Sequence, residues 1–131
     1  MSSPVSTLSN FIMGKWIPCS GENLLYHAVT GEPIYAAGTK GTDYAGMLDW
    51  ARSKGNRTLR KMTFHERARM LKALALYLTS KKELFYQISY ATGATKGDSW
   101  IDIDGGIGNL FVYASKGRRE LPDEPFLIDG N

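Results

Sequence analysis

One cysteine and two histidines are the side chains in this sequence best suited to nucleophilic or metal chemistry. Cys19 lies in the sequence PCSG, which is predicted to be a loop, and a single cysteine rules out an internal disulfide bond. His27 and His65 are far apart, and neither has a cysteine or histidine partner at the spacing of metal ligands. The sequence therefore predicts no metal site.

Charged side chains offer two further possibilities. Asp98, Asp102 and Asp104 could act as paired acid and base, but a helix cap followed by a polar helix face explains them better. The region between 57 and 72 is basic, and we favour a solvated helix face over a contact for an anion or phosphate. Its cations are Arg57, Arg60, Lys61, Arg67, Arg69 and Lys72.

Three glycines stand inside an otherwise helical pattern. They are Gly105, Gly106 and Gly108, and each interior glycine costs a helix about 1 kcal/mol relative to alanine. Close packing against another backbone is the favoured explanation, and room for a substrate is the second. A phosphate-binding loop comes last, because GGIG differs from G-x-G-x-x-G and the preceding SWIDID reads as helix rather than strand.

The element that must position these glycines is a helix within the stretch from Ser89 to Pro122. Asp98 is suited to cap its start, and apolar residues then recur at helical spacing from Trp100 to Ala114. Basic residues near its end suit the negative pole of the helix dipole, and Pro122 prevents continuation.

The whole region 42–121 is predicted to be helical. One helix follows Thr42 and ends at Gly55. The capping-box patterns TFHE at 63–66 and SKKE at 80–83 predict the starts of two more.

Short strands precede the helices. Residues 1–10 are expected to form a loose tail, and residues 11–37 are expected to form hairpins. Gly14-Lys15 marks the first turn and Thr30-Gly31-Glu32 the second. The predicted fold is an α/β piece in which β-hairpins are followed by about four helices.

Composition is that of a globular fold. The chain has 131 residues, of which 43% are hydrophobic and 22% charged, and its net charge is +3. This mild positive charge argues against a nucleic-acid partner. No apolar run is long enough to span a membrane, and the first residues lack a signal-peptide pattern. We therefore expect a cytoplasmic protein with no membrane partner.

The stretch TGATKGDSWIDIDGGIGNLFVYASKGRREL resembles the aldehyde dehydrogenase superfamily. More narrowly, it is similar to the bifunctional ring-opening enzymes of bacterial phenylacetate degradation, which fuse an aldehyde dehydrogenase to an oxepin-CoA hydrolase domain. The similarity continues through FIMGKWI, HAVTGEPI, the segment Asp43–Gly55 and LRKMTFHERARMLKALA. It implies that residues 1–131 are the incomplete N-terminal part of a cofactor-binding domain.

The resemblance also implies where the chemistry lies. The family's catalytic cysteine, general-base glutamate and oxyanion-binding asparagine fall beyond the equivalent of Asn131, as do its main nicotinamide-cofactor segments. No catalytic or cofactor-binding residue is expected in this chain, and Cys19 is read as a surface thiol. Ile101 and Gly105 match the tunnel-facing side of a family helix that passes the substrate tunnel, and Gly108 continues that face.

For the intact enzyme, the resemblance implies hydrolysis of oxepin-CoA and oxidation of the resulting CoA-linked semialdehyde with NADP or NAD. This chain alone is expected to bind no cofactor and to be inactive. The alternative is a free-standing interaction module that reuses the family's helices. In either case the apolar helix stripes after Thr42 predict self-association.

Overall fold

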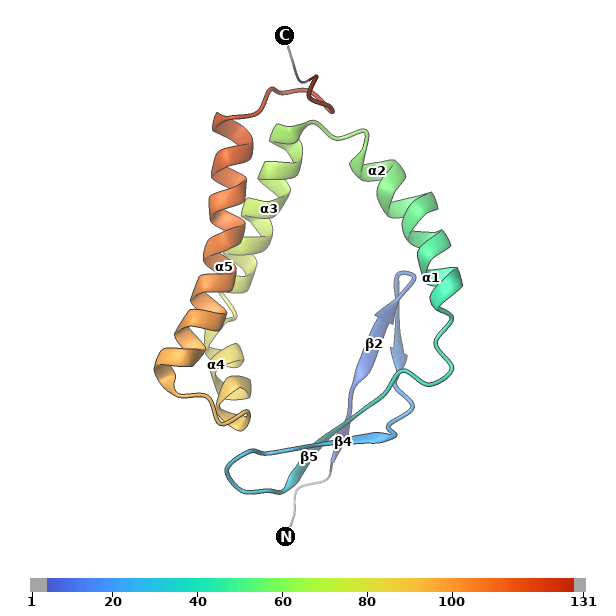
Figure 1. Cartoon of the computed structure of the whole chain (residues 1–131), viewed down its shortest axis with the longest axis vertical. Coiled ribbons are helices and arrows are strands. Elements are labelled where there is room, and N and C mark those ends of the chain that lie inside the picture. Colours follow the sequence, from blue (N-terminus) through green and yellow to red (C-terminus); the bar gives the residue numbers. More distant parts are fainter. Residues whose placement is uncertain (1–4, 129–131) are drawn as a thin grey trace. The chain divides into compact units, whose positions relative to one another are not determined.

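A computed structural model describes residues 5–128 of the chain (Figure 1). The chain divides into two compact units. Among the described residues, the first unit contains 5–55 together with the short segment Ala91–Gly93, and the second contains Asn56–Tyr90 and 94–128.

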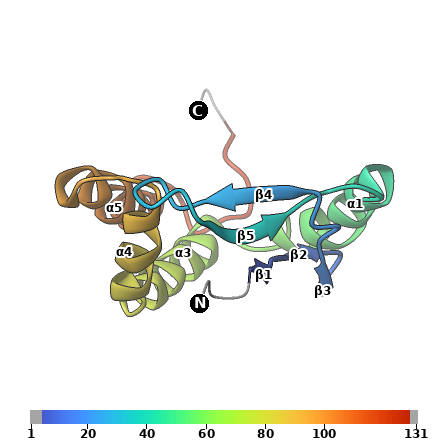
Figure 2. The same cartoon turned by 90° about the horizontal axis from the view of Figure 1, so that it is seen from below.

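The strands of the first unit form two small sheets. In one, β2 (Ser9–Ile12) pairs antiparallel with β3 (Lys15–Pro18). The other has the order β1 (Ser6–Thr7), β5 (Pro33–Ala37) and β4 (Asn23–Tyr26). In that sheet β1 is parallel and β4 antiparallel to β5, and Figure 2 shows β4 and β5 side by side.

The expected loose tail over 1–10 is wrong for residues 6–10. Ser6 pairs with Tyr35 on β5, and Ser9 pairs with Pro18 on β3. Polar residues form strands here because the ladder hydrogen bonds come from the backbone, and the partner strands lie farther along the chain. Residues 1–4 lie outside the described part.

The predicted first hairpin is present, but its turn lies one residue earlier than expected. Ile12 pairs with Lys15, so Met13 and Gly14 form the two-residue turn. Their φ angles are 48° and 80°, the left-handed values that a two-residue hairpin turn with matching twist requires. Glycine adopts this conformation without strain, whereas Met13 does not.

The second turn joins β4 to β5 and includes the predicted Thr30-Gly31-Glu32. The His27 N–H donates to the Glu32 carbonyl at 2.8 Å, and the Gly31 N–H donates to the His27 carbonyl at 2.8 Å. Local hydrogen bonds therefore close this turn, as its residue types predict.

Helices follow the strands, so the predicted order of elements is confirmed. The described helices are α1 (Tyr44–Trp50), η1 (Ala51–Asn56, a π-helix), α2 (Arg57–Leu59), α3 (Phe64–Thr79), α4 (Lys82–Ala91) and α5 (Lys96–Arg119). Across residues 5–128, no helix combines the length and apolar character needed to cross a membrane.

The predicted helix end at Gly55 is wrong. The chain continues as η1 through Asn56 and then as α2 to Leu59. Gly55 is not among the residues with a positive φ, so it lacks the left-handed conformation by which glycine ends a helix.

The three predicted helix starts have different outcomes. The capping box of Thr63 and Glu66 is confirmed, because each side chain accepts a hydrogen bond from the other residue's backbone N–H. The box predicted at Ser80 is wrong. Ser80 caps the end of α3, and its hydroxyl donates to the Tyr77 carbonyl at 2.6 Å.

The N-cap of α5 is Thr95 and not Asp98. The Thr95 hydroxyl accepts from the Asp98 N–H, and the Asp98 carboxylate accepts from the Thr95 N–H, both at 3.2 Å. The Thr95 hydroxyl also donates to the Asp98 carboxylate at 2.6 Å, and this bond, followed by that from the Thr95 N–H, lowers the pKa of Asp98. The helix thus begins three residues earlier than predicted, because threonine and aspartate at this spacing form a reciprocal cap.

The core of the second unit lies between α3 and α5, which run side by side (Figure 1). Small residues dominate it: Ala68 and Ala75 from α3, and Ala114 and Gly117 from α5, are all buried. Because these residues are small, the two helix backbones approach closely.

Candidate functional site

The residues predicted to line a substrate tunnel share one open face of α5. Ile101 is 63% exposed, and a Cβ placed at Gly105 or Gly108 would meet no atom within 4 Å. The packing explanation predicts another backbone tight against Gly105 and Gly106, and residues 5–128 provide none. Within the described chain these glycines are therefore not explained by close packing, and the tunnel role stays a prediction.

The close approach occurs instead at Gly117, which sequence reasoning did not single out. A Cβ at Gly117 would lie 3.2 Å from the Ala68 Cβ and 3.8 Å from the Phe64 carbonyl oxygen. Helical spacing from Ile107 through Ala114 to Gly117 places this glycine on the buried face and could have revealed it.

Asp104 joins α4 to α5 through a polar network. Its carboxylate accepts from the Lys82 ammonium group and, at 2.6 Å, from the Tyr86 hydroxyl. The bond from Lys82, and after it the bond from Tyr86, lowers the pKa of Asp104. The same bond to Asp104 raises the pKa of Tyr86 to about 12. Lys82 and Tyr86 are four residues apart on α4, so one helix face presents both donors.

A second polar contact also connects α4 to α5. The hydroxyl of buried Ser99 on α5 lies 2.8 Å from that of Ser89 on α4. The Asp104 carboxylate, predicted as part of a polar helix face, is thus bonded to Lys82 and Tyr86 and is not paired with a second carboxylate among these contacts.

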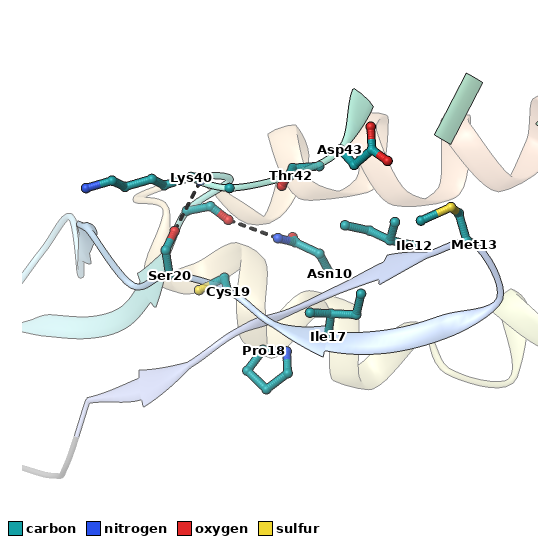
Figure 3. A pocket seen from close by; sticks show the side chains of 12 residues that line it. Asn10, Ile12, Met13, Ile17, Pro18, Cys19, Ser20, Lys40, Thr42 and Asp43 are labelled. Carbon is teal, nitrogen blue, oxygen red and sulfur yellow. Dashed lines mark hydrogen bonds between the residues drawn. The ribbon is translucent and has the colours of Figure 1, made fainter. Parts of the chain in front are cut away.

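A cavity of about 210 Å³ lies in the first unit and contains the chain's one cysteine (Figure 3). The Cys19 sulfur lies 3.3 Å from the Ala36 carbonyl oxygen, to which it donates. No histidine is among the residues that line the cavity, and the Lys40 amine points away from it in Figure 3. Among residues 5–128 the Cys19 thiol is thus hydrogen-bonded to a carbonyl and to no basic side chain, which is not the arrangement of an activated nucleophile.

The wall of this cavity is held by Glu22 and Asn10. The Glu22 carboxylate accepts from the Ser20 hydroxyl and, at 3.1 Å each, from the backbone N–H groups of Thr39 and Lys40. The bond from Ser20 has the largest effect, and together these bonds lower the pKa of Glu22. The Asn10 amide donates to the Gly38 carbonyl at 2.9 Å (Figure 3). These polar groups therefore hold the loops that line the cavity.

Both histidines have structural contacts. One ring nitrogen of His65 lies 3.0 Å from the Leu121 carbonyl oxygen, and the other lies 3.7 Å from the Asp123 carboxylate. His27 accepts from the backbone N–H groups of Val29 and Thr30. Among residues 5–128, no three histidine, cysteine or acidic side chains are grouped to hold a metal ion.

The basic cluster predicted between 57 and 72 divides into separate roles. The Arg67 guanidinium lies 4.4 Å from the centre of the Phe64 ring and donates to the Pro125 carbonyl at 3.1 Å. Lys72 instead lines a groove of about 310 Å³ with residues of α5. The α5 residues are Phe111, Ala114, Ser115 and Arg118.

The sequence was compared with known protein families and with characterised proteins. No family model matches the sequence. A 3,4-dehydroadipyl-CoA semialdehyde dehydrogenase from Aromatoleum evansii is 38% identical over 113 residues, which are 85% of this chain. The chain spans 22% of the length of that relative. The predicted resemblance to aldehyde dehydrogenases is thus confirmed, in that the chain is similar in sequence to one part of a semialdehyde dehydrogenase, while the narrower resemblance to bifunctional ring-opening enzymes stays a prediction.

Proposed function

We propose that this chain forms part of a dehydrogenase that oxidises a CoA-linked semialdehyde with NAD or NADP. The observation that carries the proposal is the 38% identity to the semialdehyde dehydrogenase, sustained over 113 residues. The strands followed by helices are compatible with the opening part of a cofactor-binding domain.

The chain's own residues supply scaffold and not chemistry in this proposal. Cys19 donates to a backbone carbonyl, and both histidines contact neighbouring backbone groups. The three interior glycines lie inside α5 and not ahead of it, so they do not form the glycine-rich turn that cradles a dinucleotide at a helix start. No catalytic step is therefore assigned to residues 5–128.

The test measures reduction of NAD and NADP with 3,4-dehydroadipyl-CoA semialdehyde. We expect turnover by the intact protein encoded by the source gene and none by the 131-residue chain. Turnover by this chain that is abolished in Cys19→Ala would refute the scaffold role. An intact protein that oxidises no CoA-linked semialdehyde would refute the assignment.

Ile101, Gly105 and Gly108 are proposed to line the substrate tunnel of that intact enzyme. Their shared open face supports this, because a glycine without a packing partner leaves width for a long substrate. Gly105→Met in the intact enzyme should lower turnover of the CoA-linked substrate while a small aldehyde is still accepted.

Gly106→Met is the matched control for the tunnel test. It introduces the same side chain one residue along, where the added Cβ also meets nothing within 4 Å, but on a different face of α5. Equal effects of the two substitutions on both substrates would remove the tunnel proposal.

The finer assignment to a bifunctional ring-opening enzyme stays a prediction. The relative's name describes the dehydrogenase reaction alone. Release of a CoA-linked semialdehyde from oxepin-CoA by the intact protein would support a fused hydrolase, and its absence would leave only the dehydrogenase.

A self-associating interaction module is the second candidate, and exposed apolar side chains on α5 favour it. Trp100, Ile101 and Tyr113 are 60%, 63% and 64% exposed. A large contiguous apolar patch usually marks an interface, and self-association requires that these side chains be covered by a second copy of the chain. Light scattering of the isolated chain should show a species larger than a monomer, and a strictly monomeric chain at high concentration would contradict self-association.

A further inference from the structure

The groove between α3 and α5 is lined by two cations from two different helices. Lys72 contributes from the middle of α3, and Arg118 contributes from the last turn of α5. The groove volume of about 310 Å³ falls at the lower end of the range of roughly 300–1,000 Å³ typical of small-molecule sites.

Neither cation is neutralised by the part of the chain that the structure describes. No acidic side chain lines the groove. Among residues 5–128, neither cation forms an ion pair with a carboxylate, and Glu120, two residues after Arg118, pairs instead with Lys116. The helix dipole favours a cation at Arg118, but it does not account for Lys72 in the middle of its helix.

Ser115 adds a hydroxyl to the same groove. A helix hydroxyl can donate back to its own helix, as that of Thr79 does to the Ala75 carbonyl at 2.8 Å. The Ser115 hydroxyl has no hydrogen bond to any residue from 5 to 128, and it lines the groove beside the half-buried Phe111 ring. The groove thus combines two cations, a free hydroxyl donor and an apolar wall.

We propose that this groove binds a ligand carrying a diphosphate group, with Lys72 and Arg118 on its phosphate oxygens and Ser115 donating to it. Two cations on opposing helices suit a group with two neighbouring negative charges, and phosphate oxygens accept charge-assisted hydrogen bonds from both side chains. The proposal is independent of the dehydrogenase assignment, because its test uses no aldehyde and measures no turnover.

The test titrates inorganic diphosphate into the full 131-residue chain at low salt and follows binding by calorimetry and by amide NMR shifts. Shifts of the wild-type chain should centre on the amides of Lys72, Ser115 and Arg118. Binding should weaken as salt is added, because exposed charges are screened. This mapping requires no variant.

Lys72→Ala and Arg118→Ala should each weaken diphosphate binding by about tenfold. Lys96→Ala is the matched control, since it removes the same charge at the opposite end of α5 and should leave the affinity unchanged. Lys72→Arg should retain binding. Lys72 and Arg118 are exposed, so the variants are expected to keep the far-ultraviolet circular dichroism of the wild type.

Coenzyme A and NADP, each of which carries a diphosphate, distinguish the sources of the ligand. Tighter binding of one of them than of inorganic diphosphate identifies that source, and equal binding of all three identifies the diphosphate as sufficient. Absence of saturable binding, shifts that map away from the groove, or equal losses in Lys96→Ala and Lys72→Ala would each overturn the proposal.

Discussion

Gly117 of α5 lies so close to Ala68 of α3 that a side-chain carbon added at Gly117 would sit 3.2 Å from the Ala68 Cβ. Both residues are buried, and they belong to the two helices that form the core of the second unit. The contact fixes how near α5 can come to α3, because neither residue has a side chain that could move aside.

Gly117→Val should destabilise the chain by about 2 kcal/mol, since two branched methyl groups must enter a closed contact. Urea unfolding followed by circular dichroism measures the loss. A free energy of unfolding equal to that of the wild type would show that α3 and α5 separate at little cost.

Gly105→Ala should have the opposite effect and raise the free energy of unfolding by about 0.5–1 kcal/mol. Alanine is the better helix former, and an added Cβ at Gly105 meets no atom within 4 Å. The same urea titration measures it. A loss of stability would mean that a neighbouring surface covers this face of α5 in solution.

Acid should destabilise the chain through its bonded carboxylates. The pKa values of Asp98 and Asp104 are lowered from 3.8 and that of Glu22 from 4.5. A carboxyl with a lowered folded-state pKa stabilises the fold above its ordinary pKa and loses that contribution as pH falls through the folded value. Thermal unfolding should therefore shift to lower temperature below about pH 4.5.

Asp104→Asn provides the comparison for this acid effect. The variant keeps the size of the side chain but removes the charge that Lys82 contacts, so its melting temperature should fall at neutral pH and vary less with pH than that of the wild type. Parallel pH curves for the two proteins would show that Asp104 does not contribute.

Thr63→Ala should cost about 1 kcal/mol because it removes the hydroxyl that caps α3. The Thr63 oxygen accepts from the Glu66 N–H at 3.1 Å. Ser115→Ala also removes a helix hydroxyl, but one without a capping bond, and should leave stability unchanged or slightly higher. Equal losses in both variants would contradict the capping role.

Local signals in the sequence predicted local features of the fold. The turns at Gly14 and Gly31 and the capping box at Thr63 depend on residues that are close in sequence, and the structure contains all three. The cap of α5 was displaced from Asp98 to Thr95 because Asp98 is equally suited to either position of a reciprocal cap.

Long-range contacts could not be predicted in the same way. Strand β1 has no apolar alternation and pairs only because β5 provides a partner. The Asp104 network forms only where α4 lies against α5. The groove of Lys72 and Arg118 forms only where α3 lies against α5. Spacing along one helix shows which residues share a face, but not which residue of another helix meets them.

The parallel pairing of β1 with β5 has a consequence for the order of folding. The antiparallel β2–β3 and β4–β5 pairs close short loops, whereas Ser6 reaches Tyr35 only after the intervening chain has folded back. The entropy cost of closing a loop rises with the length of chain enclosed. The two residue pairs of β1 contribute few hydrogen bonds to offset this cost. Strand β1 should thus pair last during folding and separate first during local unfolding. Within this sheet, the backbone amide hydrogens of β1 should therefore exchange fastest with solvent.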